Sequence, residues 1–354
     1  MGDYCNFLDE LTEELIAAPP PSSQNLTSPD ISVIIPAYNT ADYIVECLRS
    51  VVNQTLKNIE ILVVDDGSTD KTNSVVKMFM QYDWRIKLIT QRNQGPGIAK
   101  NNAIKIARGK CIAFIDSDDI LEYDALEKTY KIYEQTKSDI VIFGAYGLCK
   151  GKKTKCHYSI KKVPKRLLGK TLTPFSAKDT MFKLPVIAMC KLYDRKFLIE
   201  NNILFQEVKK GEDQLFFVKS ILMANKLYII NQNLYGYRKD RKDSLTYSKL
   251  KKDNSVILNF YAIEKFLQTY NINYDIKLKI LNKYFNKCVS WLGKCEKSYR
   301  NDYFNELRKL IVYLQENHPE LSSVNIKLSP YSKYFIIKFK LLYLLLRRKL
   351  NGNK

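Results

Sequence analysis

Short apolar runs alternate along the chain with longer segments in which apolar residues recur at helical spacing. The short runs are typical of buried strands and cover residues 31–36, 61–64, 86–89, 111–115 and 139–143. The helical spacing covers residues 43–54, 71–81, 97–108, 124–136 and 213–224. Strands and helices follow one another in turn, and the strands are apolar throughout instead of alternating apolar and polar residues. The pattern therefore predicts an α/β fold. Its sheet should be mostly parallel and covered on both faces.

Turn-forming and capping residues set the expected ends of several elements. Pro36 is expected to end the first strand, and Gly109 is expected to close the helix over 97–108. Either Thr69 or Asp70 is expected to cap the helix that follows them, with Asp70 the favoured residue. The segments beyond these ends are predicted to be loops.

Composition divides the chain into three parts. Residues 1–29 form an acidic leader and a Pro-rich linker, residues 30–247 carry the strand and helix alternation, and residues 248–354 are basic and mainly helical. Within the middle part, the segment 150–170 is expected to be a loop or a hairpin over the ligand site. At 354 residues, the chain is long enough for a catalytic domain with an appended segment.

The formal net charge of +20 is spread unevenly along the chain. Residues 1–30 carry acids only, whereas 150–170 hold nine Lys or Arg residues and no acid, and 321–354 hold eight and no acid. Such basic zones favour a phosphate-bearing partner, whether a nucleotide, a nucleic acid or an anionic lipid headgroup. The alternative is a solvated lysine surface on a protein of biased composition.

Cysteine usage and hydropathy indicate the compartment. The eight Cys residues include no Cys-x-x-Cys pair, and Cys111 and Cys190 lie in apolar runs as small buried side chains. The start of the chain lacks a secretory signal, and no apolar stretch is long enough to span a bilayer. We therefore expect a cytoplasmic protein. Residues 330–350, apolar and rimmed by cations, are expected either to contact the inner face of the cell membrane or to dock on the protein's own core.

Clusters of acidic residues follow two of the predicted strands. One strand runs into Asp65 and Asp66, and a later strand runs into Asp116, Asp118 and Asp119. Carboxylates this close repel one another, so the clusters indicate a bound metal or a hydroxyl-rich ligand. Ligands of parallel sheets bind beyond the carboxyl ends of the strands, which places both clusters on one rim. An enzyme is therefore the leading interpretation.

Five segments in order resemble the family 2 glycosyltransferases, which are inverting enzymes with a GT-A nucleotide-sugar-binding fold. They are Val33–Asn39, Val64–Asp70, Asn93–Asn101, Asp116–Asp119 and Gly211–Phe216. Each segment alone is a weak signal, but their order and spacing over about residues 30–245 make the resemblance specific. It implies a GT-A glycosyltransferase domain over 30–247 with a C-terminal helical extension.

By this resemblance, the first two segments bind the nucleoside. Pro36, Ala37 and Tyr38 flank it, with Tyr38 offering a ring face to the base. Asp66 accepts a hydrogen bond from the uracil N–H, and Asp65 supports the site. The alternative for Tyr38 is an aromatic side chain that shields the sheet edge.

The resemblance also assigns a metal site and a catalytic base. Asp116 would contact the ribose, Asp118 would bind Mn²⁺ or Mg²⁺ bridging the diphosphate, and Asp119 would be a supporting or structural acid. Glu212 and Asp213 match the family's Glu-Asp pair, whose aspartate takes the proton of the acceptor hydroxyl. The alternative for Asp213 is an acid that stabilises the dipole at a helix N-terminus.

Basic residues would share the charge of the diphosphate. Lys100 stands where the family commonly has Arg, so a point charge would replace a bidentate clamp. Arg238 or Arg241 would contact the diphosphate in place of the family's downstream His, which is missing here; the alternative for Arg241 is surface charge. Lys191 matches a further family position and is expected to support the site by pairing with an acid.

The expected function is a metal-dependent inverting glycosyltransferase that moves a sugar from a UDP-sugar to a saccharide or lipid-linked acceptor, in surface polysaccharide or glycan synthesis. One alternative is a non-catalytic binder of nucleic acid or anionic surfaces. The acids at the strand ends count against it, since they would repel a phosphate backbone, and no nucleic-acid partner is expected. The other alternative is a nucleotidyltransferase on a related fold, which would carry a Gly-rich loop in place of residues 36–39. The sequence leaves the donor sugar, the acceptor, the linkage and the oligomeric state open.

Overall fold

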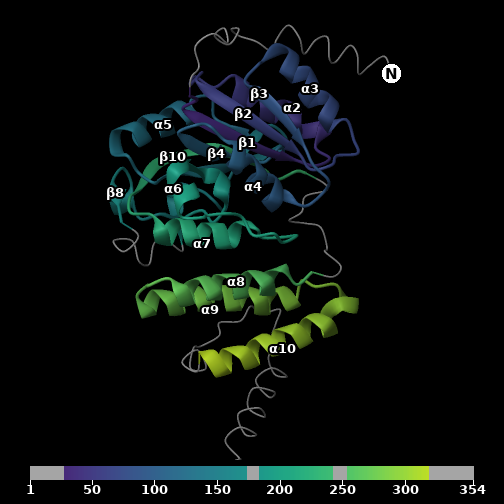
Figure 1. Cartoon of the computed structure of the whole chain (residues 1–354), viewed down its shortest axis with the longest axis vertical. Coiled ribbons are helices and arrows are strands. Elements are labelled where there is room, and N and C mark those ends of the chain that lie inside the picture. Colours follow the sequence, from purple (N-terminus) through teal and green to yellow (C-terminus); the bar gives the residue numbers. More distant parts are fainter. Residues whose placement is uncertain (1–27, 174–182, 242–252, 319–354) are drawn as a thin grey trace, which may run out of the picture. The chain divides into compact units, whose positions relative to one another are not determined.

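The computed structural model describes residues 28–173, 183–241 and 253–318, which form two compact units (Figure 1). The first unit holds the described residues up to 207 and those of 212–241, and the second holds 208–211 and 253–318. Most of the leader predicted over 1–29, the segment 330–350 and the boundary predicted at 247 lie outside the described residues.

The first unit is built on one sheet, in which the described residues form ten strands in the order β3-β2-β1-β4-β9-β6-β10-β5, with β7 beside β6 and β8 beside β10. The strands are β1 Ile31–Ala37, β2 Ile59–Asp65, β3 Ile86–Thr90, β4 Cys111–Phe114, β5 Ile120–Leu121, β6 Ile140–Cys149, β7 Lys152–Thr154, β8 Thr171–Leu172, β9 Lys191–Asp194 and β10 Leu227–Arg238. β1 pairs in parallel with β2 and β4, β2 pairs in parallel with β3, and β6 pairs in parallel with β10. β9 runs antiparallel between β4 and β6. The prediction of a mostly parallel α/β sheet is therefore confirmed.

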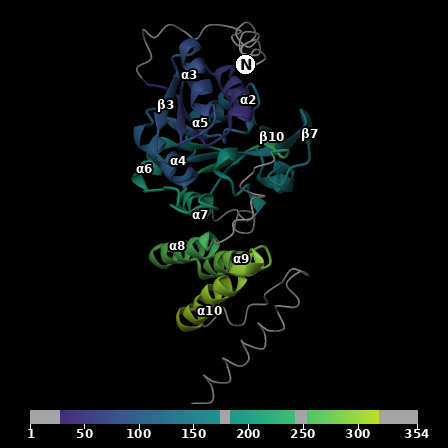
Figure 2. The same ribbon diagram turned by 90° about the vertical axis from the view of Figure 1, so that its right-hand side faces the viewer.

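Helices cover both faces of this sheet. They are α2 Ala41–Val52, α3 Thr72–Tyr82, α4 Pro96–Ile106, α5 Ala125–Thr136, α6 Arg195–Glu200 and α7 Asp213–Met223. The chain steps outward from β1 to β3 through α2 and α3, and then returns through α4 to β4. Because crossovers between parallel strands are right-handed, this reversal puts α4 on the face opposite α2 and α3, as Figures 1 and 2 show.

Burial on both faces explains the apolar composition of the central strands. Every residue of β1 and β2 is buried. The two polar residues Ser32 and Glu60 are paired with each other, because the Ser32 hydroxyl donates to the Glu60 carboxylate at 2.6 Å. Glu60 also accepts from Lys87 and from the backbone N–H of Arg108. The polar atoms are thus satisfied inside an otherwise apolar core.

Two predicted element ends are wrong. β1 continues through Pro36 to Ala37, although its pairing with β4 stops at Ile34. The backbone polar groups of Ile34 point toward β4, since the Ile34 carbonyl accepts from the Ile115 N–H. The backbone groups of Pro36, two residues later, point to the same side, where the pairing with β4 has already stopped. The missing N–H of Pro36 therefore interrupts no hydrogen bond between the strands. Helix α4 ends at Ile106 without Gly109. A Cβ on Gly109 would lie 2.4 Å from the Ser32 backbone nitrogen, so this glycine allows close packing instead.

The later part of the sheet departs further from the predicted pattern. The basic segment 150–170 forms the β6–β7 hairpin followed by short turns, as predicted. β10, by contrast, was not predicted as a strand, although it has 12 residues. Its pairing with β6 is irregular between Ile229 and Tyr235, so its apolar residues follow no regular period.

The second unit is helical, as predicted, and contains α8 Ser255–Thr269, α9 Tyr274–Leu292 and α10 Arg300–Asn317. Its buried side chains include Phe260, Leu267, Ile280, Leu281, Tyr303, Leu307 and Leu310. Glu264 of α8 is buried and accepts from the Tyr313 hydroxyl at 2.9 Å, and its other oxygen lies 2.8 Å from His318 Nε2. These contacts join α8 to the end of α10. Among the described residues, none of the helices has the length and apolar character needed to cross a bilayer.

Candidate active site

The loops that follow β1 and β2 are bonded to each other at the carboxyl end of the sheet. The Asp66 N–H donates to the Ala37 carbonyl at 2.8 Å, and the Asn39 N–H donates to the Ser68 hydroxyl at 3.0 Å. Asn39 itself adopts a left-handed conformation with φ 50°. Pro36 and Ala37 are buried in β1, whereas the Tyr38 side chain is 44% exposed at the rim. The predicted nucleoside segment therefore presents one aromatic ring to solvent.

Asp65 and Asp70 organise the turn that leads into α3. Asp65 is buried and accepts from the Ser68 N–H at 3.0 Å and from the Asn73 side chain at 2.9 Å. Asp70 accepts from the Thr72 N–H at 2.9 Å, which satisfies a donor at the start of the helix. The N-cap residue of α3 is Lys71, so Asp70, the predicted cap, lies one position before it, and Asp65 supports the same turn.

Asp66, the predicted reader of the base, holds the loop that precedes α4. Its carboxylate accepts from the side chain of Gln91 and from the backbone N–H groups of Gln94 and Gly95, each at 2.8 Å. Asp66 is also buried. Oδ1 has two of these donors and Oδ2 has one, which leaves a lone pair of Oδ2 for a ligand.

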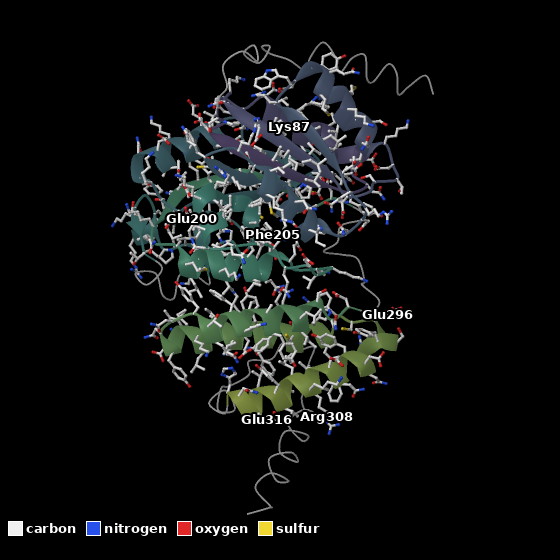
Figure 3. The ribbon with its side chains drawn as sticks, in the orientation of Figure 1. Lys87, Glu200, Phe205, Glu296, Arg308 and Glu316 are labelled. Atoms are coloured by element: carbon white, nitrogen blue, oxygen red, sulfur yellow. The ribbon has the colours of Figure 1, made fainter. Side chains whose placement is uncertain are left out.

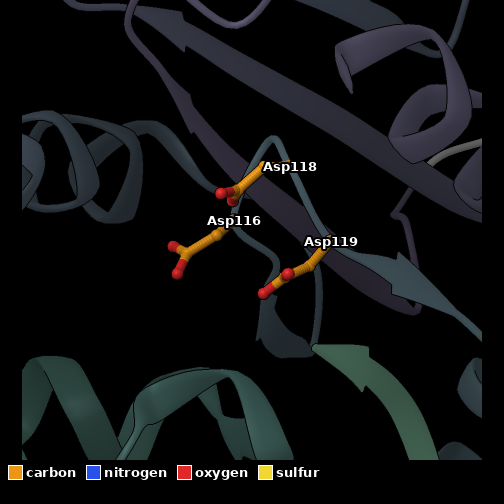
Figure 4. Close-up of side chains that lie close together, drawn as sticks. All are labelled: Asp116, Asp118 and Asp119. Carbon is orange, nitrogen blue, oxygen red and sulfur yellow. The ribbon is translucent and has the colours of Figure 1, made fainter. Parts of the chain in front are cut away.

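The three acids after β4 lie together and point to the same side of the loop (Figure 4). One carboxylate oxygen from each of Asp116, Asp118 and Asp119 lies within 4.8 Å of the others. Asp119 is buried and accepts from the Tyr235 hydroxyl at 2.6 Å and from the Arg238 N–H at 2.7 Å. β10 therefore fixes one acid of the cluster, and the predicted supporting role of Asp119 has a structural basis.

Crowding and burial shift the pKa values in this cluster upward. Burial raises the pKa of Asp116 to about 6; Lys100 opposes the shift, and the carboxylate of Asp118 adds to it. Burial, together with the neighbouring carboxylates of Asp118 and Asp116, holds the pKa of Asp119 well above its usual range. A divalent cation would relieve this repulsion, and three carboxylates are the hard oxygen donors that Mg²⁺ and Mn²⁺ prefer. The residues present thus fit such an ion.

Arg238, the last residue of β10, and Arg241, three residues beyond it, both contact Asp118. Arg241 Nη1 lies 2.9 Å from Asp118 Oδ2, and Arg238 Nε donates to the Asp118 carbonyl at 2.7 Å. Both guanidinium groups also lie over the Tyr43 ring, at 5.3 Å and 5.8 Å. Arg238 in addition pairs with Glu46. Arg241 is therefore an ion-pair partner of the acid cluster and not a fully exposed surface charge.

Lys100 joins the acid cluster to the Glu-Asp pair. Its amine lies 3.0 Å from Glu212 Oε1 and 3.8 Å from Asp116 Oδ1. It also lies 5.0 Å from the centre of the ring of Phe205, the residue that Figure 3 labels. The residue is 2% exposed. Burial lowers the pKa of Lys100, but the carboxylates of Glu212 and Asp116 outweigh burial and hold it well above its usual value. The lysine predicted to contact a diphosphate is thus paired with two acids.

Asp213 is the first residue of α7, and its place depends on a close contact with α4. A Cβ on Gly97 would lie 2.6 Å from the Gln206 carbonyl oxygen and 3.1 Å from Glu212 Cβ. The charge of Asp213 acts on Lys100, and it raises the pKa of that lysine. The structure therefore brings the predicted base to the same region as the acid cluster.

Lys191, predicted to pair with an acid, has no ion-pair partner among the described residues, but the charge of Asp213 acts on its amine. Its amine is fully buried and donates to the carbonyls of Pro185 and Ile187, both at 2.6 Å. Burial lowers its pKa to about 8. Lys191 therefore fixes the backbone before β9 and reaches no carboxylate there.

Sequence reasoning gave no role to Tyr235, Glu46 or Phe205, which all contact predicted site residues. Tyr235 lies in the Tyr-Gly-Tyr-Arg segment, so its place beside Arg238 was a usable signal. Glu46 and Phe205 lie in ordinary helical and loop sequence, and only the fold places them at the site.

Comparison with known proteins agrees with this geometry. The family model described as glycosyl transferase family 2 matches residues 32–199. Glycosyltransferase GlyG of Streptococcus pneumoniae is 33% identical over 221 residues, which cover 59% of this chain and 70% of GlyG. The poly(ribitol-phosphate) beta-glucosyltransferase of Bacillus spizizenii is 34% identical over 212 residues, which cover 58% of this chain but only 32% of that protein.

Among solved structures, S. aureus TarS 1–349 in complex with UDP-GlcNAc superposes with a TM-score of 0.66. It is 25% identical, and the match covers 82% of this chain and 83% of that one. The family model, the relatives and the ordered motifs on one rim of the sheet lead to the same assignment. The chain belongs to glycosyl transferase family 2 and is a glycosyltransferase with the GT-A fold.

Proposed function

We propose that the enzyme uses a UDP-sugar and a divalent metal, and that it transfers the sugar with inversion to a saccharide or lipid-linked acceptor in surface polysaccharide synthesis. The observation that carries the proposal is the acid cluster Asp116, Asp118 and Asp119 joined through Lys100 to the Glu212-Asp213 pair. Such an arrangement puts a cation site and a base beside one another, as a direct displacement needs.

The donor assignment is supported by the rim after β1 and β2. Tyr38 offers an exposed ring on which a base can stack, and Asp66 keeps a lone pair that can accept from the N–H edge of uracil. The superposed TarS structure holds UDP-GlcNAc, which supports UDP as the nucleotide. The named acceptors of TarS and of the Bacillus spizizenii enzyme are poly(ribitol-phosphate), which supports a polymeric acceptor.

The metal would be held by Asp118, with Asp116 and Asp119 beside it. When bound, it neutralises the charge that develops on the leaving diphosphate. Asp116 then contacts the ribose, and Arg238 and Arg241 supply further positive charge at the same place. Asp213 removes the proton of the acceptor hydroxyl as that oxygen attacks the anomeric carbon from the face opposite the diphosphate. A single displacement inverts the anomeric centre.

The test is UDP release from UDP-GlcNAc with Mn²⁺ and an acceptor preparation. We expect Asp213→Asn and Asp118→Ala each to lower transfer by about 10²–10⁴-fold, because one loses the base and the other loses the metal ligand. The matched control is Asp275→Asn, which changes an exposed first-turn acid of α9. Asp275→Asn should keep wild-type transfer.

Full transfer by both Asp213→Asn and Asp118→Ala would contradict the mechanism. Release of pyrophosphate from UTP and a sugar 1-phosphate, with no release of UDP from UDP-GlcNAc, would favour a nucleotidyltransferase. Steep salt-dependent binding of nucleic acid without any cleavage of sugar nucleotide would favour the non-catalytic alternative.

A further inference from the structure

The segment 150–170 carries nine exposed basic side chains, and this segment is here called the basic strip. Its nine charged residues are all exposed: Lys150, Lys152, Lys153, Lys155, Lys161, Lys162, Lys165, Arg166 and Lys170. Among the described residues, the strip's acid partner is Glu122, which lies 2.8 Å from Lys153. The positive charge of the strip is thus largely uncompensated within the part of the chain that the structure describes.

The strip is anchored to the sheet by its apolar residues. Ile160, Val163 and Leu167 are 2–4% exposed. The Ile160 N–H donates to the Asn233 side chain of β10 at 3.0 Å, and a Cβ on Gly144 of β6 would lie 2.4 Å from the Ile160 nitrogen. The backbone is therefore held closely against β6 and β10 while the lysines point outward.

The strip begins beside the proposed active site. The Lys239 amine donates to the Lys155 carbonyl, and Lys239 directly follows Arg238, whose side chain contacts Asp118. The Tyr158 ring packs against Tyr237 at 5.5 Å. A long ligand that lies on the strip therefore reaches the rim that carries the acid cluster.

The strip combines exposed cations with buried apolar side chains, and this combination distinguishes between three kinds of polyanionic partner: a membrane, a nucleic acid and a phosphodiester polymer. A membrane surface is bound by cations together with exposed apolar side chains, but the buried apolar residues of the strip are not available for that contact. Single-stranded nucleic acid is bound by cations interleaved with several exposed aromatic rings, whereas in the strip Tyr158 is packed against Tyr237 and His157 alone exposes a ring. A row of point charges without apolar or aromatic contacts fits a flexible chain of phosphodiesters.

We propose that the basic strip binds a phosphodiester-containing polymeric acceptor and guides its hydroxyl groups to the active site. This proposal rests on the proposed function, because it names the acceptor class of the same reaction. Binding is electrostatic, so its affinity falls with salt, and each lysine contributes to it through a separate phosphate contact.

The experiment measures binding of the full chain to poly(ribitol phosphate) over a series of salt concentrations. The test variant is Lys161→Gln/Lys165→Gln/Lys170→Gln, and the matched control is Lys77→Gln/Lys131→Gln/Lys196→Gln, which removes three exposed lysines from α3, α5 and α6. We expect the affinity of the test variant to fall about tenfold or more at low salt, with a shallower salt dependence. The control should bind as the wild type does. Thermal unfolding of each variant checks that it is folded.

Parallel measurements use neutral dextran, vesicles with anionic lipids and single-stranded DNA. Equal loss of affinity in both triple variants would overturn the proposal, because the strip would then contribute only to net charge. Tighter binding of vesicles or DNA than of poly(ribitol phosphate) would also overturn it. Metal-dependent UDP release by the wild type distinguishes failure of the strip proposal from failure of the proposed function. If UDP is released but the polymer does not bind, the strip proposal fails alone. If no UDP is released, the proposed function fails, and the acceptor role fails with it.

Discussion

At the scale of single residues, Lys100 and Lys191 are both buried, yet their pKa values shift in opposite directions. Lys100 lies beside the carboxylates of Glu212 and Asp116, and its pKa is held well above the usual value. Lys191 donates to two carbonyls, and burial lowers its pKa to about 8. Full charges compensate for lost hydration, whereas carbonyl dipoles do so only in part. The partners decide the sign of each shift.

Replacing Lys100 tests its role as the counter-charge of the site. Lys100→Met leaves Glu212 and Asp116 without their cation, and we expect the free energy of unfolding to fall by about 3 kcal/mol. The measurement is urea unfolding at neutral pH. Lys105→Met, on the exposed face of the same helix, should change stability by no more than about 0.5 kcal/mol. Equal stability of both variants would show that the acids do not need Lys100.

Lys191 predicts a pH dependence of stability. Its folded pKa of about 8 lies below the usual 10.5, so between these values the unfolded chain binds a proton that the folded chain does not. This contribution therefore makes stability rise with pH above about 8, by about 1.4 kcal/mol per pH unit. Lys191→Met removes the contribution, so the difference in unfolding free energy, wild type minus variant, should rise between pH 8 and 10.

Urea unfolding at several pH values measures this difference. Lys196→Met, an exposed lysine on α6, provides the control and should give a constant difference. A flat profile for Lys191→Met as well would mean that the Lys191 amine keeps its charge across the whole range.

The sequence identified most of the residues of the site but not their contacts. Asp65, Asp66, Asp116 and Asp118 were predictable because acids crowded at strand ends repel one another unless a cation or a polar ligand lies between them. The carbonyl partners of Lys191 were not predictable, since a buried lysine bonded to carbonyls and one paired with an acid occur in the same kind of apolar segment. Such a distinction depends on tertiary packing.

At the scale of elements, the contact between α4 and the start of α7 sets the position of Glu212 and Asp213. Gly97 makes this contact possible, because any side chain there would meet the Gln206 carbonyl and Glu212. The Gln206 N–H also donates to the Glu212 carbonyl, which joins the loop at Gln206 to the start of α7. The first four strands were predictable from their apolar runs. The strand β10 was not predictable, because its pairing with β6 is irregular and this pairing, not a local sequence pattern, makes it a strand.

Gly97→Ala is expected to lower both stability and activity. Alanine favours the helix by up to about 1 kcal/mol, but a Cβ 2.6 Å from a backbone carbonyl oxygen forces a shift that costs about 1–3 kcal/mol. The shift moves Glu212 and Asp213, so kcat for UDP release should fall more than KM changes. Urea unfolding and steady-state kinetics measure the two effects. Lys105→Ala on the same helix should leave both unchanged, and wild-type kcat in Gly97→Ala would show that the contact is not needed.

At the scale of the whole molecule, the two units differ in how their cores are made. The core of the first unit depends on a sheet whose neighbouring strands are distant in sequence, such as β1 and β4. The core of the second unit comes from three consecutive helices, and the contact between Glu264 and His318 lies inside that unit. Helical spacing predicted the second unit directly, whereas the strand order of the first required tertiary pairing that no local pattern encodes.

Separate cores predict two thermal transitions in differential scanning calorimetry. Leu62 of β2 and Leu307 of α10 are both fully or almost fully buried, one in each unit. Replacing either by Ala removes the same atoms and should cost about 2–5 kcal/mol within its own unit. Leu307→Ala should lower the transition temperature of the second unit. Each kcal/mol lost there should lower the temperature by more degrees than in the first unit, because a smaller unit has a smaller unfolding entropy. Leu62→Ala should lower the other transition. If either substitution lowers both transitions equally, or a single transition is seen throughout, the units unfold as one cooperative structure.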